Sequence, residues 1–88
     1  MSQPMEGPRE LILYMKPGCH LCENTAEMLE ELSAEFGFSF REVNILEDPK
    51  MYEEYCEVIP VVEMDGQPLL AAPFNEAMAR KVFDRTFR

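Results

Sequence analysis

Hydrophobic residues along this chain change from one spacing pattern to another at Cys19. Leu11 to Met15 form a continuous apolar run, which is typical of a short strand buried on both faces, as in a parallel sheet. From Cys19 to about Phe36 the apolar positions recur every three or four residues, at Cys22, Ala26, Leu29, Leu32 and Phe36. Glutamates fall largely on the opposite side, so this segment predicts an amphipathic helix. Gly37 is a suitable residue to end that helix.

The segment after Gly37 predicts a strand and a short helix. Phe38 to Ile45 is rich in aromatic and β-branched residues and therefore indicates a second strand. Asp48 suits the N-cap of a helix and Pro49 its first position. We expect this helix to run to about Cys56.

The last part of the chain predicts a hairpin followed by a helix. Val58 to Met64 indicates a third strand, and Asp65-Gly66 is a strong signal for a tight turn. Gln67 to Ala71 would then return as a fourth strand, antiparallel to the third. Asn75 can cap a final helix that reaches about Phe87. The inner side of this helix is predicted to consist of Met78, Val82, Phe83 and Phe87.

The predicted order of elements is β-α-β-α-β-β-α. Strands that are joined through helices should be parallel, with right-handed crossovers, and the hairpin adds an antiparallel pair. The sequence therefore predicts an α/β fold with a four-stranded mixed sheet flanked by three helices. At 88 residues we expect one domain over residues 10–88, preceded by a flexible lead-in over residues 1–9.

Composition and charge narrow the classes of partner. Hydrophobic residues make up 47% and charged residues 28% of the chain, as in an ordinary globular protein. The net charge of −9 disfavours nucleic acid and anionic membrane surfaces as partners. No stretch approaches the roughly 20 apolar residues of a membrane span, and the N-terminus lacks the apolar core of a secretory signal. We expect a cytoplasmic monomer.

Two of the three cysteines form the motif Cys19-His20-Leu21-Cys22 at the predicted junction of strand and helix. The first turn of a helix has unpaired N–H groups and the positive end of the macrodipole, which stabilise a thiolate at Cys19. Lys16 adds a positive charge to the same loop, and His20 adds another when it is protonated. Gly18 lets the turn bring a partner's backbone close to the sulfur.

Cys22 follows Cys19 by about one helical turn and shares the face of Ala26 and Leu29, so it should be the more buried thiol. This arrangement predicts that Cys19 attacks a substrate disulfide and that Cys22 then releases the substrate by attacking Cys19. In a β-α-β context such a motif favours redox chemistry over metal binding.

Two other functions stay open. A closed zinc site needs two further ligands, and the remaining nitrogen and sulfur candidates are His20, which points away from the shared cysteine face, and Cys56. We therefore predict no intrachain metal site. An iron–sulfur cluster or other metal carried through Cys19 by two chains is one alternative. An interaction domain with this α/β fold and no redox turnover is the other.

Pro60 stands at the start of a strand that should be central to the sheet, where proline is out of place unless the position is special. The loop that contains it should lie beside the start of the first helix. A trans proline at a strand start and a cis proline are both compatible with the sequence.

The stretch from Tyr14 to Cys22, with Val58-Ile59-Pro60 and Asp65-Gly66 downstream, resembles the glutaredoxin family. It is most similar to the glutaredoxin-like branch that carries a C-H-L-C-like site. The resemblance implies a thioredoxin fold and disulfide reductase activity in cell redox homeostasis. It implies Cys19 as the nucleophile, Cys22 as the resolving thiol and Lys16 as a nearby cation.

The resemblance further implies a cis bond before Pro60, beside the site. Such a bond would leave the N–H and C=O of Ile59 able to pair with an extended substrate segment.

The implied substrates are disulfide-containing proteins or small-molecule thiols, and no resident cofactor is required. Glutathione or a flavoprotein reductase would supply the electrons. In glutaredoxins a Gly-Gly pair and an acidic residue after the hairpin help to hold glutathione. This chain has Ala71-Ala72 followed by Pro73-Phe74-Asn75, which argues against glutathione and leaves the reductant open.

For the remaining side chains we predict structural positions rather than catalytic roles. We expect Cys56 to be a small buried apolar residue. Tyr52 and Tyr55 are expected to pack in the core or on the surface, with a substrate groove as the alternative. The glutamates are expected to form a solvated face.

Overall fold

A computed structural model of the chain describes residues 9–87 and contains four strands in one mixed sheet. In the sheet order β2-β1-β3-β4, β1 pairs parallel with β2 and antiparallel with β3, and β3 pairs antiparallel with β4. The predicted α/β fold with a four-stranded mixed sheet is confirmed. The strands are β1 (Arg9–Met15), β2 (Phe38–Asn44), β3 (Val61–Met64) and β4 (Gln67–Ala71).

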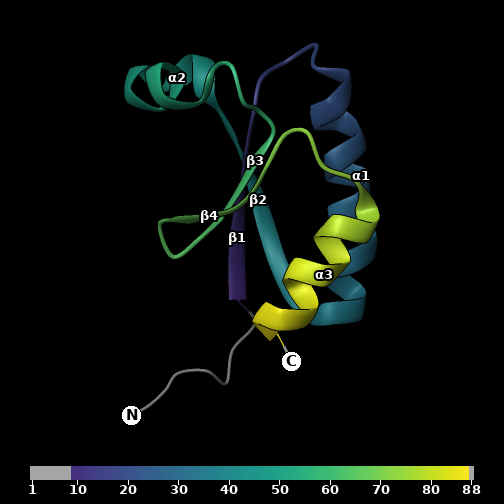
Figure 1. Cartoon of the computed structure of the whole chain (residues 1–88). Helices are drawn as coiled ribbons and strands as arrows, with labels where there is room; N and C mark the ends of the chain where they lie inside the picture. Colours follow the sequence, from purple (N-terminus) through teal and green to yellow (C-terminus); the bar gives the residue numbers. More distant parts are fainter. Residues whose placement is uncertain (1–8, 88) are drawn as a thin grey trace.

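Three α-helices flank the sheet, as predicted. They are α1 (His20–Phe36), α2 (Pro49–Tyr55) and α3 (Glu76–Phe87). α1 and α3 cover one face of the sheet, whereas α2 lies on the other side, at the upper left of the view (Figure 1). Within residues 9–87, no helix combines the length and the apolar character that crossing a membrane would require.

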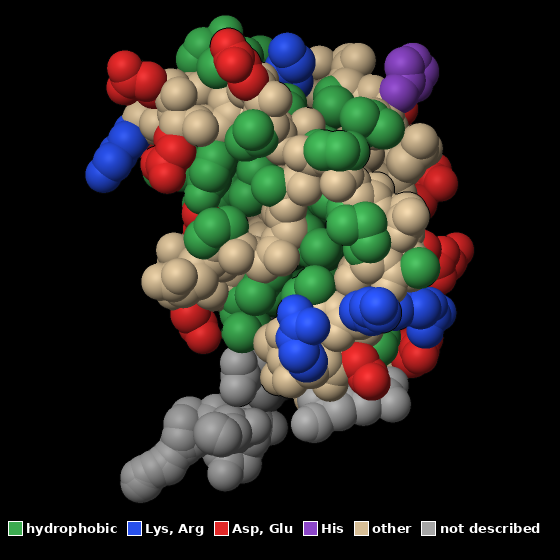
Figure 2. Space-filling model, viewed as in Figure 1, with side chains coloured by type: hydrophobic (Ala, Val, Ile, Leu, Met, Phe, Trp, Pro, Cys, Tyr) green, Lys and Arg blue, Asp and Glu red, His purple; other side chains and the backbone are tan. Residues whose placement is uncertain are grey.

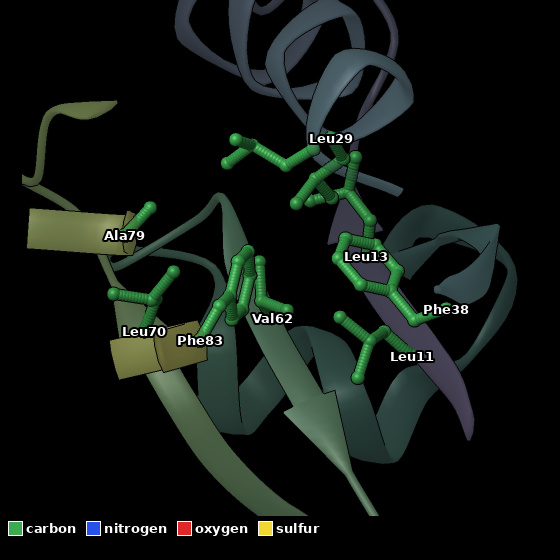
Figure 3. Packing of buried hydrophobic residues seen from close by; sticks show 9 residues of the cluster. Leu11, Leu13, Leu29, Phe38, Val62, Leu70, Ala79 and Phe83 are labelled. Atoms are coloured by element: carbon green, nitrogen blue, oxygen red, sulfur yellow. The ribbon is translucent and has the colours of Figure 1, made fainter. Parts of the chain in front are cut away.

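The larger core lies between the sheet and the pair α1 and α3. Leu11 and Leu13 of β1 point into this core toward Leu29 of α1 and Phe83 of α3 (Figure 3). Alternate residues of a strand face opposite sides of a sheet, so Ile12 and Tyr14 point to the face that α2 covers. The continuous apolar run of β1 is thus used on both faces. The buried members of this core are Leu11, Leu13, Leu29, Leu32, Phe38, Val62, Leu70, Ala79 and Phe83.

A smaller core on the α2 face contains a buried carboxylate. Glu63 of β3 is only 8% exposed. Its Oε2 accepts a hydrogen bond of 2.5 Å from the hydroxyl of Tyr55 in α2, and its Oε1 accepts one of 3.4 Å from the hydroxyl of Tyr14 in β1. The prediction that the glutamates form a solvated face is wrong for Glu63, because these two hydroxyls replace its water. The same core also buries Ile45 and Val61.

Turn and cap residues begin and end the elements largely where the sequence predicts them. Gly37 ends α1 with φ +80 and donates its N–H to the Ser33 carbonyl. Asp48 accepts the Met51 N–H at the start of α2. The side chain of Asn75 accepts the N–H of Met78 and so caps the start of α3. Asp65 and Gly66 both have positive φ, 55 and 79, as a two-residue hairpin requires.

Some boundaries differ from the prediction. β2 ends at Asn44, because its side chain accepts the Leu46 N–H and begins a 3₁₀ turn, η1 (Ile45–Glu47). β3 starts at Val61 rather than at Val58, whose N–H instead closes a turn onto Tyr55.

Two further predictions concern the ends of the chain. β1 begins at Arg9, which the prediction placed in the lead-in; the rest of that lead-in, residues 1–8, lies outside the described residues. On α3, Met78 is 48% exposed, so its predicted inward position is wrong. Ala79 is buried there instead, because it lies one turn before Phe83 on the same face.

Candidate functional site

The Cys19 sulfur lies at the N-cap of α1. Cys19 has extended backbone angles, φ −96 and ψ 108, and its Sγ accepts the backbone N–H of Cys22 at 3.1 Å. This N–H belongs to the first turn of the helix and has no acceptor within the helix itself. Gly18, with φ +80, turns the chain between β1 and the helix. The side chain of Cys19 is partly exposed, so its sulfur combines a hydrogen-bond donor with access from solvent.

Cys22 is 1% exposed and lies on the inner face of α1. Burial, and next the neighbouring Cys19, together raise the pKa of its thiol to about 11, although the backbone and the charge of Lys16 act in the opposite direction. The site therefore combines one accessible sulfur, at Cys19, with a buried thiol at Cys22 that stays protonated at neutral pH.

The residues predicted to support Cys19 lie in different surroundings. Lys16 is exposed and acts electrostatically on Cys22. The His20 side chain is 95% exposed, and its Nδ1 lies 4.0 Å from a carboxylate oxygen of Glu23. The imidazole, purple in Figure 2, projects from the surface. The imidazole thus lies at the outer limit of ion-pair distance from Glu23 and faces solvent.

The structure brings the loop before β3 beside the start of α1. The Ile59–Pro60 peptide bond is cis, and Pro60 is buried. Pro60 lines the same hollow as Leu21 and Thr25 of α1. Ile59 precedes β3, and within residues 9–87 neither its N–H nor its C=O makes a hydrogen bond.

The loop after β4 completes this part of the surface. The Ala72–Pro73 bond is also cis. The Ala72 N–H is shared between the carbonyls of Val58, at 3.2 Å, and Pro60, at 3.1 Å. Ala72, Pro73 and Phe74 line the hollow opposite α1.

Three residues of this site were not predicted, namely Leu21, Thr25 and Phe74. Thr25 follows Cys22 by three positions, so helical periodicity alone places it on the same face. Phe74 carries no such signal, since its position depends on how the β4–α3 loop folds back over α1.

Metal ligands are scarce around the two thiols. Across residues 9–87, no three side chains of the types His, Cys, Asp and Glu lie together as they would around a metal ion. Cys56, the third cysteine, is half-buried on the α2 side and packs against the cluster of Tyr14, Ile45, Tyr55 and Val61.

Comparison with known proteins identifies the family. Residues 10–83 match the family model described as "Glutaredoxin-like domain (DUF836)". The chain belongs to this glutaredoxin-like family. Over 72 residues, which are 76% of this chain and 69% of the relative, it is 32% identical to protein Rv0508 of Mycobacterium tuberculosis.

Solved structures place the glutaredoxin-like domain among thioredoxin folds. Protein Ne2328 of Nitrosomonas europaea superposes with a TM-score of 0.79 at 24% identity, with all of both chains covered. Thioredoxin 1 of Thermosipho africanus superposes with a TM-score of 0.67 at 11% identity, over 88% of this chain and 92% of the thioredoxin. The predicted thioredoxin-like fold is confirmed. Membership of the glutaredoxin-like family supports a redox type of function at this general level.

Proposed function

We propose that this protein is a thiol–disulfide oxidoreductase that reduces disulfides through a cycle between the Cys19–Cys22 dithiol and disulfide. The observation that carries the proposal is the position of the Cys19 sulfur, which caps α1 and accepts the Cys22 N–H at 3.1 Å. A thiolate is the attacking species in disulfide exchange, and a helix N-terminus favours a thiolate over a thiol. Cys22, buried one turn further on, is the matching resolving group.

The reaction proceeds in two exchanges. The Cys19 thiolate attacks one sulfur of the substrate disulfide, so that a Cys19–substrate disulfide forms and the second substrate sulfur leaves as a thiolate. Cys22 then loses its proton and attacks the Cys19 sulfur, which releases the first substrate sulfur. The substrate gains two electrons and two protons in total. The enzyme is left with a Cys19–Cys22 disulfide.

A separate thiol or flavoprotein must return two electrons to that disulfide before the next turnover. No resident cofactor enters these steps. Glutathione and a flavoprotein reductase are both chemically competent reductants, and a reducing compartment such as the cytoplasm would keep the pair in the dithiol form. We propose the cytoplasm as the working compartment on this ground.

Reduction of bis(2-hydroxyethyl) disulfide by the protein, with dithiothreitol to return two electrons to the Cys19–Cys22 disulfide and a protein-free reaction as blank, tests the cycle, because this small neutral disulfide needs no docking surface. We expect Cys19→Ser to abolish the reaction. Cys22→Ser removes the resolving thiol but keeps the backbone N–H that the Cys19 sulfur accepts, so a mixed disulfide with substrate should accumulate and be visible by mass spectrometry. Cys56→Ser is the matched control and should turn over at the wild-type rate.

Two results would contradict the proposal. One is retention of full activity in Cys19→Ser. The other is purification of the wild-type protein with stoichiometric iron and a visible absorption band that disappears in Cys19→Ser, which would make the protein a cluster carrier.

A further inference from the structure

The outer edge of β2 is the longer and more regular edge of the sheet. Within residues 9–87, β2 and β4 are the two strands that have a neighbouring strand on one side alone. β4 is five residues long, contains Pro68 and has a register irregularity opposite Val62 and Glu63. β2 has seven residues without proline or glycine, and its register with β1 is continuous from Phe38 to Asn44. Proline, bulges and short length keep an edge from pairing, so β4 is protected and β2 is open to another strand.

An acidic groove lies beside this edge, between β2 and α1. Its volume is about 130 Å³, and Ala26 and Phe40 form its apolar part. The other lining residues are exposed glutamates, Glu27 and Glu30 of α1 and Glu42 of β2. Acidic side chains also gather over α1 at the right-hand edge of Figure 2. Within residues 9–87 none of the carboxylates that line the groove takes part in an ion pair, so its negative charge is not compensated there.

The opposite face of β2 differs in charge. Alternate residues of a strand face opposite sides of the sheet, so Arg41 lies on the α2 face. Its Nε is 3.6 Å from a carboxylate oxygen of Glu10. A strand added to the edge of β2 would therefore meet unpaired carboxylates with one set of its alternate side chains. The other set would meet a surface on which the charges are paired.

Cationic side chains fit the acidic groove better than a metal ion does. Across residues 9–87 no three acidic side chains are grouped as they would be around a metal ion. A lysine or arginine can lay its alkyl stem on Phe40 and Ala26 while its charged end stays in water near the glutamates. A second copy of this chain is disfavoured at the edge, because it would bring two acidic grooves and two net charges of −9 together. Charge thus selects a basic partner and keeps copies of this chain apart.

We propose that the edge of β2 binds a basic extended segment of a partner protein as an added strand. The segment is about as long as β2 itself. It carries lysine or arginine at every second position, facing the acidic groove, and uncharged residues between them. Hydrogen bonds to the main chain of β2 supply the affinity, and the alternate side chains supply the specificity. The inference does not depend on the proposed disulfide exchange, since neither Cys19 nor Cys22 takes part.

Fluorescence anisotropy of a labelled seven-residue peptide tests the proposal. The peptide carries lysine at every second position, with threonine and valine between. We expect saturable binding to the wild-type protein at a Kd below about 1 mM. A peptide of the same composition with its lysines in one block should bind roughly fivefold more weakly, because a block places half of its charges on the other face.

Removing the charge of the groove should weaken binding of the alternating peptide about tenfold, since each exposed ion pair adds a few-fold at most. The variant for this test combines Glu27→Gln, Glu30→Gln and Glu42→Gln. The matched control loses the same charge at exposed glutamates that do not line the groove, and it should bind within about twofold of the wild-type protein. That control combines Glu31→Gln, Glu53→Gln and Glu57→Gln.

Nuclear magnetic resonance of the amide protons locates the bound strand. Pairing should move the signals of alternate residues of β2 downfield, because amide protons shift in that direction when they gain a hydrogen bond. The signals of β4 should stay in place and serve as the internal control.

Three results would overturn the proposal. The first is the absence of saturable binding by the alternating peptide. The second is equal weakening in the two triple variants, which would mean that only the net charge matters. The third is a set of shifts that leaves β2 unchanged. A wild-type dimer in sedimentation experiments whose formation shifts the β2 signals without peptide would assign the edge to a second copy of this chain instead.

Discussion

Removing one hydroxyl from the buried cluster on the α2 face gives the sharpest test of the packing. Tyr55→Phe keeps the aromatic ring and deletes the group that donates to Glu63 Oε2 at 2.5 Å. Both side chains are 8% exposed, so water cannot readily replace the lost donor. The carboxylate would then keep, within the described residues, the longer bond of 3.4 Å from Tyr14.

The expected cost follows from the two bond lengths. Hydrogen bonds to charged groups contribute about 1.5–3 kcal/mol to stability, so we expect Tyr55→Phe to lower the free energy of unfolding by about 2 kcal/mol. For a domain of this size that corresponds to a Tm decrease of roughly 8–16 °C. The Tyr14 bond exceeds the usual O–H···O range of about 2.5–3.0 Å. We therefore expect Tyr14→Phe to cost only about 0.5–1 kcal/mol.

Urea unfolding at pH 7, followed by far-ultraviolet circular dichroism, measures these free energies. Tyr52→Phe is the matched control, because Tyr52 lies on the same helix but is 45% exposed, and its variant should unfold like the wild-type protein. A double variant of Tyr14 and Tyr55 should lose more than the sum of the single variants, since Glu63 then keeps neither tyrosine donor. The reasoning would be refuted if Tyr14→Phe cost as much as Tyr55→Phe, or if Tyr55→Phe cost nothing.

Three further predictions concern the cysteines, the tyrosines and a helix end. At pH 7 iodoacetamide should label Cys19 well before Cys22, whose pKa burial raises to about 11; equal labelling in a peptide map would contradict this. Burial, and then Glu63, raise the pKa of Tyr14 and Tyr55. Both hydroxyls titrate near pH 10 when unfolded, so the stability that they contribute is complete below that pH and is lost as the pH rises above it. Thermal scans from pH 7 to pH 11 should show this loss, with a smaller slope in Tyr55→Phe. Gly37→Ala should lower the free energy of unfolding in urea by about 1–2 kcal/mol, because a residue with a Cβ is strained at φ +80. The added Cβ would meet no neighbour within 4 Å, so this backbone strain is the whole expected cost. An unchanged midpoint would contradict this.

Much of the fold was predictable because local chemistry determines it. The apolar run of β1, the αL position at Gly37 and the Asp65-Gly66 turn each depend on a few neighbouring residues. The burial of Glu63 was not predictable in this way. Its partners lie 8 and 49 positions away along the chain, and a single glutamate in a strand has the same local pattern whether it meets water or a hydroxyl.

In the candidate site, too, the features set by neighbouring residues were predictable and those set by long-range contacts were not. The motif Cys19-His20-Leu21-Cys22 predicts a capping sulfur and a buried partner, since both depend on the first turn of one helix. The apolar hollow depends instead on the β4–α3 loop, where Ala72, Pro73 and Phe74 lie over α1. That approach is a long-range contact, and the sequence alone showed only that the residues expected for glutathione are missing from this loop.

The shared hydrogen of Ala72 has a consequence for how the hollow responds to a ligand. One N–H connects the backbone of the β4–α3 loop to the carbonyls on both sides of Ile59. A ligand that displaces either loop would therefore lengthen at least one of these two hydrogen bonds. The exchange rate of this single amide hydrogen with deuterium would then report on the two loops at once.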